Sequence, residues 1–189
     1  SSWVPLLNLA GIFGASVNNS CTSQDPYLTV SEERIAHWKS ILGTKKNRRY
    51  AIHWQGNPDH EFTLSRGRSM RLEELKPLLN LKDIEWINLQ KGPGSEQSQV
   101  NPWINRWHPQ QKKIDSAWSF EDALAILYCC DGLISTDSGL AHLAGAGGVR
   151  VLLMLPWLAE WRWGLVGNYS QWYPNHQLYR QSDEGNWLS

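Results

Sequence analysis

The chain has 189 residues, which suffices for one α/β domain with a hydrophobic core and is too short for two full domains. With 41% hydrophobic and 19% charged residues, the composition is globular and excludes disordered and fibrous proteins. The 18 basic residues balance 18 acidic ones, so no net field favours nucleic acid or an anionic membrane as a partner. No apolar run approaches the ~20 residues of a membrane span, and none is predicted.

The three cysteines are Cys21 and the adjacent pair Cys129 and Cys130. An odd number with two neighbours is a poor disulfide framework, so a buried, reduced thiol and a cytoplasmic location are expected. The 12 tryptophans suit either core packing or stacking on sugars and bases. Packing is the expected role of most of them, including Trp163.

Residues 1–28 differ from the rest, because they carry turn-forming stretches such as Asn18-Asn19-Ser20 and Asp25-Pro26. Their first ten residues are apolar but have no basic leader, so no signal peptide is predicted. We interpret residues 1–28 as a linker or the tail of an N-terminal domain, and residues 29–189 as one domain.

From residue 29, apolar periodicity and cap residues define regular elements. Helices are predicted over 31–42, 72–79, 120–130 and 138–146. Strands are predicted over 50–54, 84–89, 113–115, 132–135, 151–155 and 177–180. Polar loops are predicted over 59–69 and 95–111, the second of them flexible and exposed. This alternation predicts an α/β, Rossmann-like fold, with a parallel sheet covered by helices on both faces.

The strongest candidate site is the strand-to-helix link that begins at Asp137. Ligands of such sheets bind beyond the carboxyl ends of the strands. With Asp137 as N-cap, the amides of Ser138, Gly139 and Leu140 would point outward from a positively polarised helix end. That arrangement suits a pyrophosphate, and His142 would lie on the same helix face. The alternative is an ordinary capped helix whose histidine is satisfied internally.

A basic cluster is the second candidate. Seven Lys and Arg residues but only two acids lie between Lys45 and Arg71. Arg66 and Arg68 follow the first predicted strand, and their planar guanidinium groups suit phosphate oxygens. The alternative is a solvated charged loop. The four basic residues over 45–49 precede the strand, at the wrong edge of the sheet, and receive no role.

Gln90 and Lys91 follow the second predicted strand and could hydrogen-bond a base or ribose. His and Cys residues do not fall into short paired spacings, so no metal site is predicted. No Walker loop, Gly-x-Gly-x-x-Gly fingerprint or Gly-x-Ser-x-Gly elbow is present, and no cofactor is expected.

Several segments together resemble the heptosyltransferase-like family 9 glycosyltransferases. Thr136-Asp137-Ser138-Gly139-Leu140-Ala141-His142 is similar to the Asp-Thr/Ser-Gly-x-x-His segment of that family. The wider set resembles the glycosyltransferase domain that follows tetratricopeptide repeats in many bacterial proteins. It comprises His53-Trp54-Gln55-Gly56-Asn57-Pro58, Arg66-Gly67-Arg68-Ser69, Leu89-Gln90-Lys91-Gly92-Pro93, Phe120-Glu121-Asp122-Ala123, Leu155-Pro156, Glu160-Trp161-Arg162-Trp163, Trp172-Tyr173-Pro174 and Leu178-Tyr179-Arg180-Gln181. Their order and spacing hold over roughly residues 26–187.

The resemblance implies the C-terminal, donor-binding half of a two-domain (GT-B) glycosyltransferase. It implies that the segment from Asp137 to His142 holds the diphosphate of a nucleotide-sugar substrate, assisted by Arg66 or Arg68. Gln90 and Lys91 would face the nucleoside. The family inverts the anomeric carbon by direct displacement and needs no metal for donor binding; the acceptor is not specified.

Two departures from the family bear on activity. The acceptor-binding N-terminal domain, with the presumed general base, is essentially absent from the chain. The family's common Asp-Thr-Ala reads Asp122-Ala123-Leu124 here, which removes a hydroxyl group. The isolated domain is therefore expected to bind the donor but not to catalyse transfer of the sugar. The alternative function is a non-catalytic module that recognises nucleotide sugars or proteins.

Overall fold

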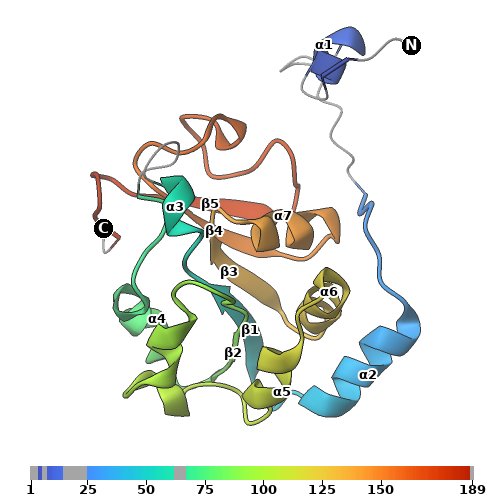
Figure 1. The fold of residues 1–189 in the computed structure, drawn as a ribbon, viewed down its shortest axis with the longest axis vertical. Coiled ribbons are helices and arrows are strands. Elements are labelled where there is room, and N and C mark those ends of the chain that lie inside the picture. Colours follow the sequence, from blue (N-terminus) through green and yellow to red (C-terminus); the bar gives the residue numbers. More distant parts are fainter. Residues whose placement is uncertain (1–3, 6–7, 15–24, 62–66, 188–189) are drawn as a thin grey trace.

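The computed structural model describes residues 4–5, 8–14, 25–61 and 67–187. Within these residues, five parallel strands form one sheet. They are β1 (Arg48–His53), β2 (Ile84–Asn88), β3 (Gly132–Thr136), β4 (Val151–Leu155) and β5 (His176–Arg180). Their order is β2-β1-β3-β4-β5, with parallel pairing throughout (Figure 1). The predicted α/β, Rossmann-like class is confirmed.

Burial on both faces of the sheet explains why its central strands are so apolar. All five residues of β3 are buried. In β4, Val151 and Leu153 pack into the core on one face, whereas Leu152 and Met154 pack against the core on the other. Successive side chains of a strand point to opposite faces, so a strand covered on both sides is apolar throughout.

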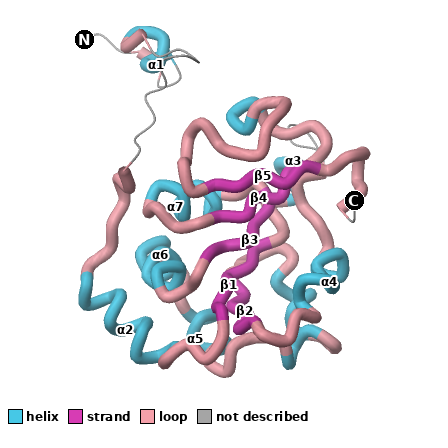
Figure 2. The backbone as a smooth tube through the Cα atoms, turned by 180° about the vertical axis from the view of Figure 1, so that it is seen from behind, coloured by secondary structure: helices cyan, strands magenta, loops and turns pink. Residues whose placement is uncertain are grey.

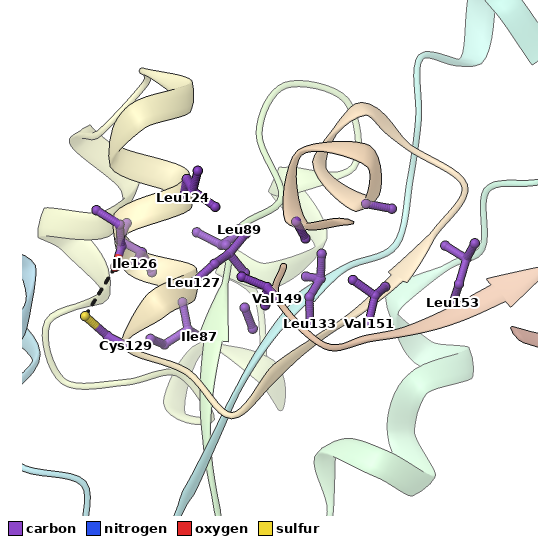
Figure 3. Packing of buried hydrophobic residues seen from close by; sticks show 14 of the residues in the cluster. Ile87, Leu89, Leu124, Ile126, Leu127, Cys129, Leu133, Val149, Val151 and Leu153 are labelled. Atoms are coloured by element: carbon purple, nitrogen blue, oxygen red, sulfur yellow. Dashed lines mark hydrogen bonds between the residues drawn. The ribbon is translucent and has the colours of Figure 1, made fainter. Parts of the chain in front are cut away.

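One face of the sheet is covered by α6 (Phe120–Tyr128) and α7 (Gly139–Ala146), with α2 (Glu32–Leu42) packed against α6 (Figure 2). Figure 3 shows how side chains of α6 meet those of the strands in this core. The residues labelled there are Ile87, Leu89, Leu124, Ile126, Leu127, Cys129, Leu133, Val149, Val151 and Leu153. Cys129 is a buried free thiol, as predicted, and burial raises its pKa.

The predicted ends of α2 are confirmed. Ser31 caps it, because its hydroxyl accepts from the amide of Arg34, and the helix stops at Gly43, where φ is +67°. Asp122 of α6 anchors α2 by accepting hydrogen bonds from Arg34 Nη1 at 2.7 Å and Trp38 Nε1 at 3.0 Å. These bonds hold the outer helix in place.

The other face of the sheet is covered by short helices. They are α3 (Pro58–Glu61), η2 (Leu72–Leu75), α4 (Lys76–Leu79), η3 (Ser95–Gln99) and η4 (Trp103–Asn105). The second core lies beneath them and contains Tyr50, Ile52, Trp54, Met70, Leu72, Leu75, Leu79, Trp86, Trp103 and Ile134. Pro77 falls in the first turn of α4, where it is tolerated, rather than weakening the end of that helix.

Two predictions in this part of the chain were wrong, and a third was wrong over residues 59–61. Residues 113–115 are not a strand, because they lie within α5 (Gln111–Ser116) beside β2. Residues 95–111 are not a flexible exposed loop: Trp103 is buried, and Trp107 stacks on Trp54 with ring centroids 6.3 Å apart. The predicted loop over 59–69 begins inside α3, and its residues 62–66 lie outside the described chain.

The remaining elements are α1 (Leu9–Ile12) and η5 (Trp161–Trp163), the latter in the connection from β4 to β5. Trp163 is buried, as predicted. The amides of Tyr27 and Leu28 both donate to the carbonyl of Ala146 at the end of α7. Residues 27 and 28, at the end of the predicted linker, therefore contact the domain.

Candidate functional site

The strand order reverses between β1 and β3. This reversal, the switch point of the sheet, locates the candidate site. β1 leads to β2 on one side, whereas β3 leads through β4 to β5 on the other. Connections that leave such a pair of strands diverge to opposite sides, which opens a crevice beyond their carboxyl ends. Here those ends are His53 and Thr136, and α7 begins three residues after Thr136.

The tip of α7 is open to solvent. Its N-cap is Ser138, whose hydroxyl accepts from the amide of Ala141 at 3.3 Å, so the prediction that Asp137 is the cap was wrong. The amides of Gly139 and Leu140 have no partner within the described chain. Gly139 is exposed, and a Cβ atom built on it would meet nothing within 4 Å. The space beside Gly139 is therefore free of protein atoms, and an anion could approach the helix tip through it.

His142 reaches back over this tip. Its Nε2 atom lies 3.8 Å from Oδ1 of Asp137, and its Nδ1 atom lies 3.0 Å from the hydroxyl of Tyr173. The ring also stacks on Trp163, with centroids 5.1 Å apart. Burial lowers the pKa of His142, more than Asp137 raises it, so the neutral ring is favoured near pH 7. The structure thus brings Asp137 and His142 together beside the exposed amides.

Gln90 lies at the same edge, but its amide group is occupied. Its Oε1 atom accepts from the amides of Trp54 and Gln55, and its Nε2 atom donates to the carbonyls of Gln55 and Pro93. These bonds tie the loop after β1 to the loop after β2. In this arrangement Gln90 shapes the site, and no polar atom of its side chain is left over for a base or ribose.

Lys91 is also held by the protein. Its ammonium donates to the carbonyls of Ile114 at 2.7 Å and Asp115 at 2.8 Å, near the end of α5. It lies 5.6 Å from the ring centroid of Trp118. Burial lowers its pKa. Because an ammonium has three protons, one donor is left after these two bonds.

Arg68 lies close to the end of β1, whereas Arg66 falls outside the described residues. Its Nε atom is 3.4 Å from Oε1 of Glu61, and its guanidinium packs against the backbone at Gly56. Burial, reinforced by the charge of Arg68, lowers the pKa of His53 to about 4, so His53 is neutral at physiological pH. Arg68 is thus a partly neutralised cation at the edge of the candidate site.

A cavity of about 260 Å³ adjoins the tip of α7. Its walls come from the ends of β1 and β2, the start of α6 and the first turn of α7. The lining residues are His53, Leu89, Lys91, Ala117, Trp118, Ser119, Phe120, Ala123, Ile126 and Leu140. Leu140 belongs to both the helix tip and the cavity wall. Ala123 of α6 also lines the cavity.

The chain matches no family model, no curated protein and no solved structure. The function of the chain is therefore inferred from the geometry of the site.

Sequence reasoning missed two polar atoms at the switch point. The Nδ1 atom of His53 and the Oγ1 atom of Thr136 are buried and have no hydrogen-bond partner within the described chain. Buried polar groups usually find a protein, water or ligand partner, because an unpaired one costs free energy. The available signal was position: both residues are the last of their strands, where ligands of this fold bind.

Among the described residues, no group of three or more His, Cys, Asp or Glu side chains could hold a metal ion. No helix of the described chain has the length and apolar character needed to cross a bilayer.

Proposed function

We propose that this domain binds the nucleotide-sugar donor of an inverting glycosyltransferase with a GT-B architecture. The observation that carries the proposal is the junction of two complementary surfaces at one switch point. The open tip of α7 suits an anion, and the cavity beside it suits an apolar ring system. Leu140 belongs to both, so one ligand could bridge them. The resemblance to the family 9 glycosyltransferases supports the same ligand.

In this proposal the diphosphate lies on the amides of Gly139 and Leu140. The bond between the donor's anomeric carbon and the diphosphate oxygen breaks as an acceptor hydroxyl attacks the opposite face of that carbon. The hydroxyl proton passes to a general base of the acceptor-binding domain, and negative charge grows on the departing diphosphate. Fixed donors that face this charge lower the barrier, because they need no reorganisation during the reaction. The helix tip and Arg68 supply that positive potential, with Arg66 as the second candidate, so no metal is invoked. The cysteine content favours the cytoplasm as the location.

The cavity would take the nucleoside. Its ~260 Å³ lies just below the ~300–1,000 Å³ of pockets for whole drug-sized ligands, so it fits part of a nucleotide sugar. Trp118 and Phe120 at its lining are 73% and 71% exposed, which leaves their rings available to cover a planar base. Lys91 offers its remaining proton to the same space.

Thermal unfolding in the presence of UDP-, GDP- and ADP-sugars tests the proposal. A ligand at about 100 times its dissociation constant stabilises the folded state by ~2.7 kcal/mol. For a domain of this size, that raises Tm by about 5–10 °C. We expect such a rise with at least one donor. If none of the three nucleotides shifts Tm at millimolar concentration, the domain is a protein-recognition module and the donor function is wrong.

Replacing both Arg66 and Arg68 with alanine is expected to weaken diphosphate ligands more than the free nucleoside. Removal of charged hydrogen-bond donors should cost nucleoside diphosphates about tenfold in affinity. The nucleoside should lose less than about twofold, since it has no phosphate to contact. Calorimetric titration of the variant with the preferred nucleoside and its diphosphate measures both. Equal weakening of the two ligands would remove the phosphate-binding role of this loop.

A further inference from the structure

Tyr173 holds the histidine of the helix tip from the side opposite to Asp137. It comes from the connection between β4 and β5, and its hydroxyl lies 3.0 Å from Nδ1 of His142. Its ring packs directly on α7, where a Cβ atom at Gly145 would come within 2.5 Å of it. Glycine at this position is therefore what allows the tyrosine to approach. Burial raises the pKa of the Tyr173 hydroxyl, and the neighbouring Tyr27 raises it further.

Two proton arrangements fit a tyrosine hydroxyl within hydrogen-bond distance of an imidazole nitrogen. In one, Tyr173 donates to Nδ1. In the other, Nδ1 carries the proton and donates to Tyr173. A neutral imidazole has only one proton, so the surroundings of Nε2 decide between them. Nε2 lies 3.8 Å from the carboxylate of Asp137, which favours a proton on Nε2. The first arrangement follows.

We propose that Tyr173 is a positioning residue, which holds His142 as the tautomer protonated on Nε2, so that a hydrogen-bond donor faces the open tip of α7. A side chain on a helix leans toward its N-terminus, so this ring covers the turn that contains Gly139. The proton on Nε2 lies between the Asp137 carboxylate and an anion at the tip, and it reduces their repulsion. The ligand part of this inference rests on the proposed function, whereas the tautomer is a property of the free protein.

The tautomer matters because His142 is neutral when no ligand is bound. Burial lowers its pKa more than the neighbouring carboxylates raise it. A neutral ring can offer a donor or an acceptor at Nε2, and only the donor suits a phosphate. The titratable and charged groups around the ring are Asp137, Glu160, Arg162, Tyr173, Tyr27 and His176. Tyr173 is the one among them that contacts Nδ1.

The first test measures binding of inorganic pyrophosphate to the wild type and to Tyr173→Phe by calorimetry. At about pH 8 we expect the variant to lose about tenfold in affinity, because its imidazole is free to present an acceptor to the anion. At a pH low enough for the anion-bound imidazole to carry both protons, the tautomer no longer matters, and the loss should shrink to about twofold or less. Comparing variant with wild type at each pH cancels the titration of pyrophosphate itself.

Tyr169→Phe is the matched control, since Tyr169 comes from the same connection and is 70% exposed. It should bind like the wild type at both pH values. The pH comparison is also protected from other buried histidines, because the pKa values of His53 and His176 are both about 4. A loss in Tyr173→Phe that is the same at both pH values would indicate packing alone and would overturn the positioning role.

The second test observes the tautomer directly by nitrogen-15 NMR of histidine-labelled protein without ligand. The wild type should show a protonated Nε2 and an unprotonated Nδ1 for His142, with the signal assigned by its loss in His142→Gln. A protonated Nδ1 would overturn the inference, whatever the protein binds. If the tautomer is as expected but pyrophosphate and all nucleotides fail to bind, the proposed function and the ligand part of this inference are wrong together.

Discussion

Replacing Gly139 with leucine is expected to abolish nucleotide binding and to leave the domain as stable as the wild type. The new side chain would stand in the space through which an anion reaches the amides of residues 139 and 140. Loss of two charge-assisted hydrogen bonds at ~1.5–3 kcal/mol each should cost about 100-fold or more in affinity. Folding should tolerate the change, because a Cβ atom at Gly139 meets nothing within 4 Å. Titration of a nucleoside diphosphate, with Tm as the check on folding, measures both effects.

Two variants make this prediction specific. Glu32→Leu changes the same first helical position in α2, far from the switch point, and should leave binding intact. Gly139→Ala adds one methyl group and should reduce affinity less than leucine does. Full binding by Gly139→Leu would mean that the ligand does not lie on the tip of α7. That result would contradict the proposed function. A variant that no longer folds would contradict the stability half of the prediction.

Much of the fold follows from local patterns. The uniformly apolar run from Val151 to Leu155 and the capped start of α2 at Ser31 are decided by residues next to each other in the chain. The order of the strands does not follow from such patterns. It depends on which helix packs on which face, and the switch point between β1 and β3 becomes visible only in the assembled sheet.

The wrong elements are those decided by distant contacts. Ile114 with polar neighbours fits a strand as well as a helix over so short a stretch. The structure decides for the helix. Gln111 hydrogen-bonds the backbone of Asn88, and the ammonium of Lys91 donates to two carbonyls near the end of α5. Trp107 likewise stacks on a residue more than 50 positions earlier in the chain, Trp54, which turns a polar-looking stretch into a packed one.

At the candidate site too, local sequence predicted some features, whereas contacts between distant residues decided others. The position of the site was predictable, because the loops after parallel strands meet at one edge. The function of each side chain was not, as Gln90 shows: its amide group joins two loops that are 35 residues apart. Asp and Ser cap helices about equally well, so local sequence could not choose between Asp137 and Ser138. In the structure the Ser138 hydroxyl is supported by Ser135 at 3.0 Å, and the carboxylate faces His142.

The second large effect is expected at the amino-terminal ends of the strands, on the side of the sheet away from the candidate site. There, Arg49→Met should destabilise the domain by about 3 kcal/mol. Arg49 is only 2% exposed, and it donates to Glu85 at 2.8 Å. It also donates to the carbonyls of Leu42 and Gly43 at the end of α2. Removing the guanidinium leaves a partly buried carboxylate and two carbonyls without this partner. Tm should fall by about 6–12 °C for a domain of this size, and nucleotide affinity should not change.

The pH dependence of this loss identifies its cause. Burial raises the pKa of Glu85, but hydrogen bonds from the Lys46 amide and Arg49, with the charge of Arg49, outweigh it, and the net shift is downward. A carboxyl whose folded-state pKa is depressed stabilises the fold above its unfolded pKa of about 4.3 and loses that contribution as pH falls through the folded value. The difference in unfolding free energy between wild type and Arg49→Met should therefore narrow below about pH 4.

The exposed neighbour provides the control, since the unfolding free energy of Arg48→Met should stay within about 0.5 kcal/mol of the wild type. If both variants unfold alike, the buried ion pair contributes nothing; if the loss in Arg49→Met stays constant down to about pH 3, its origin is packing rather than charge.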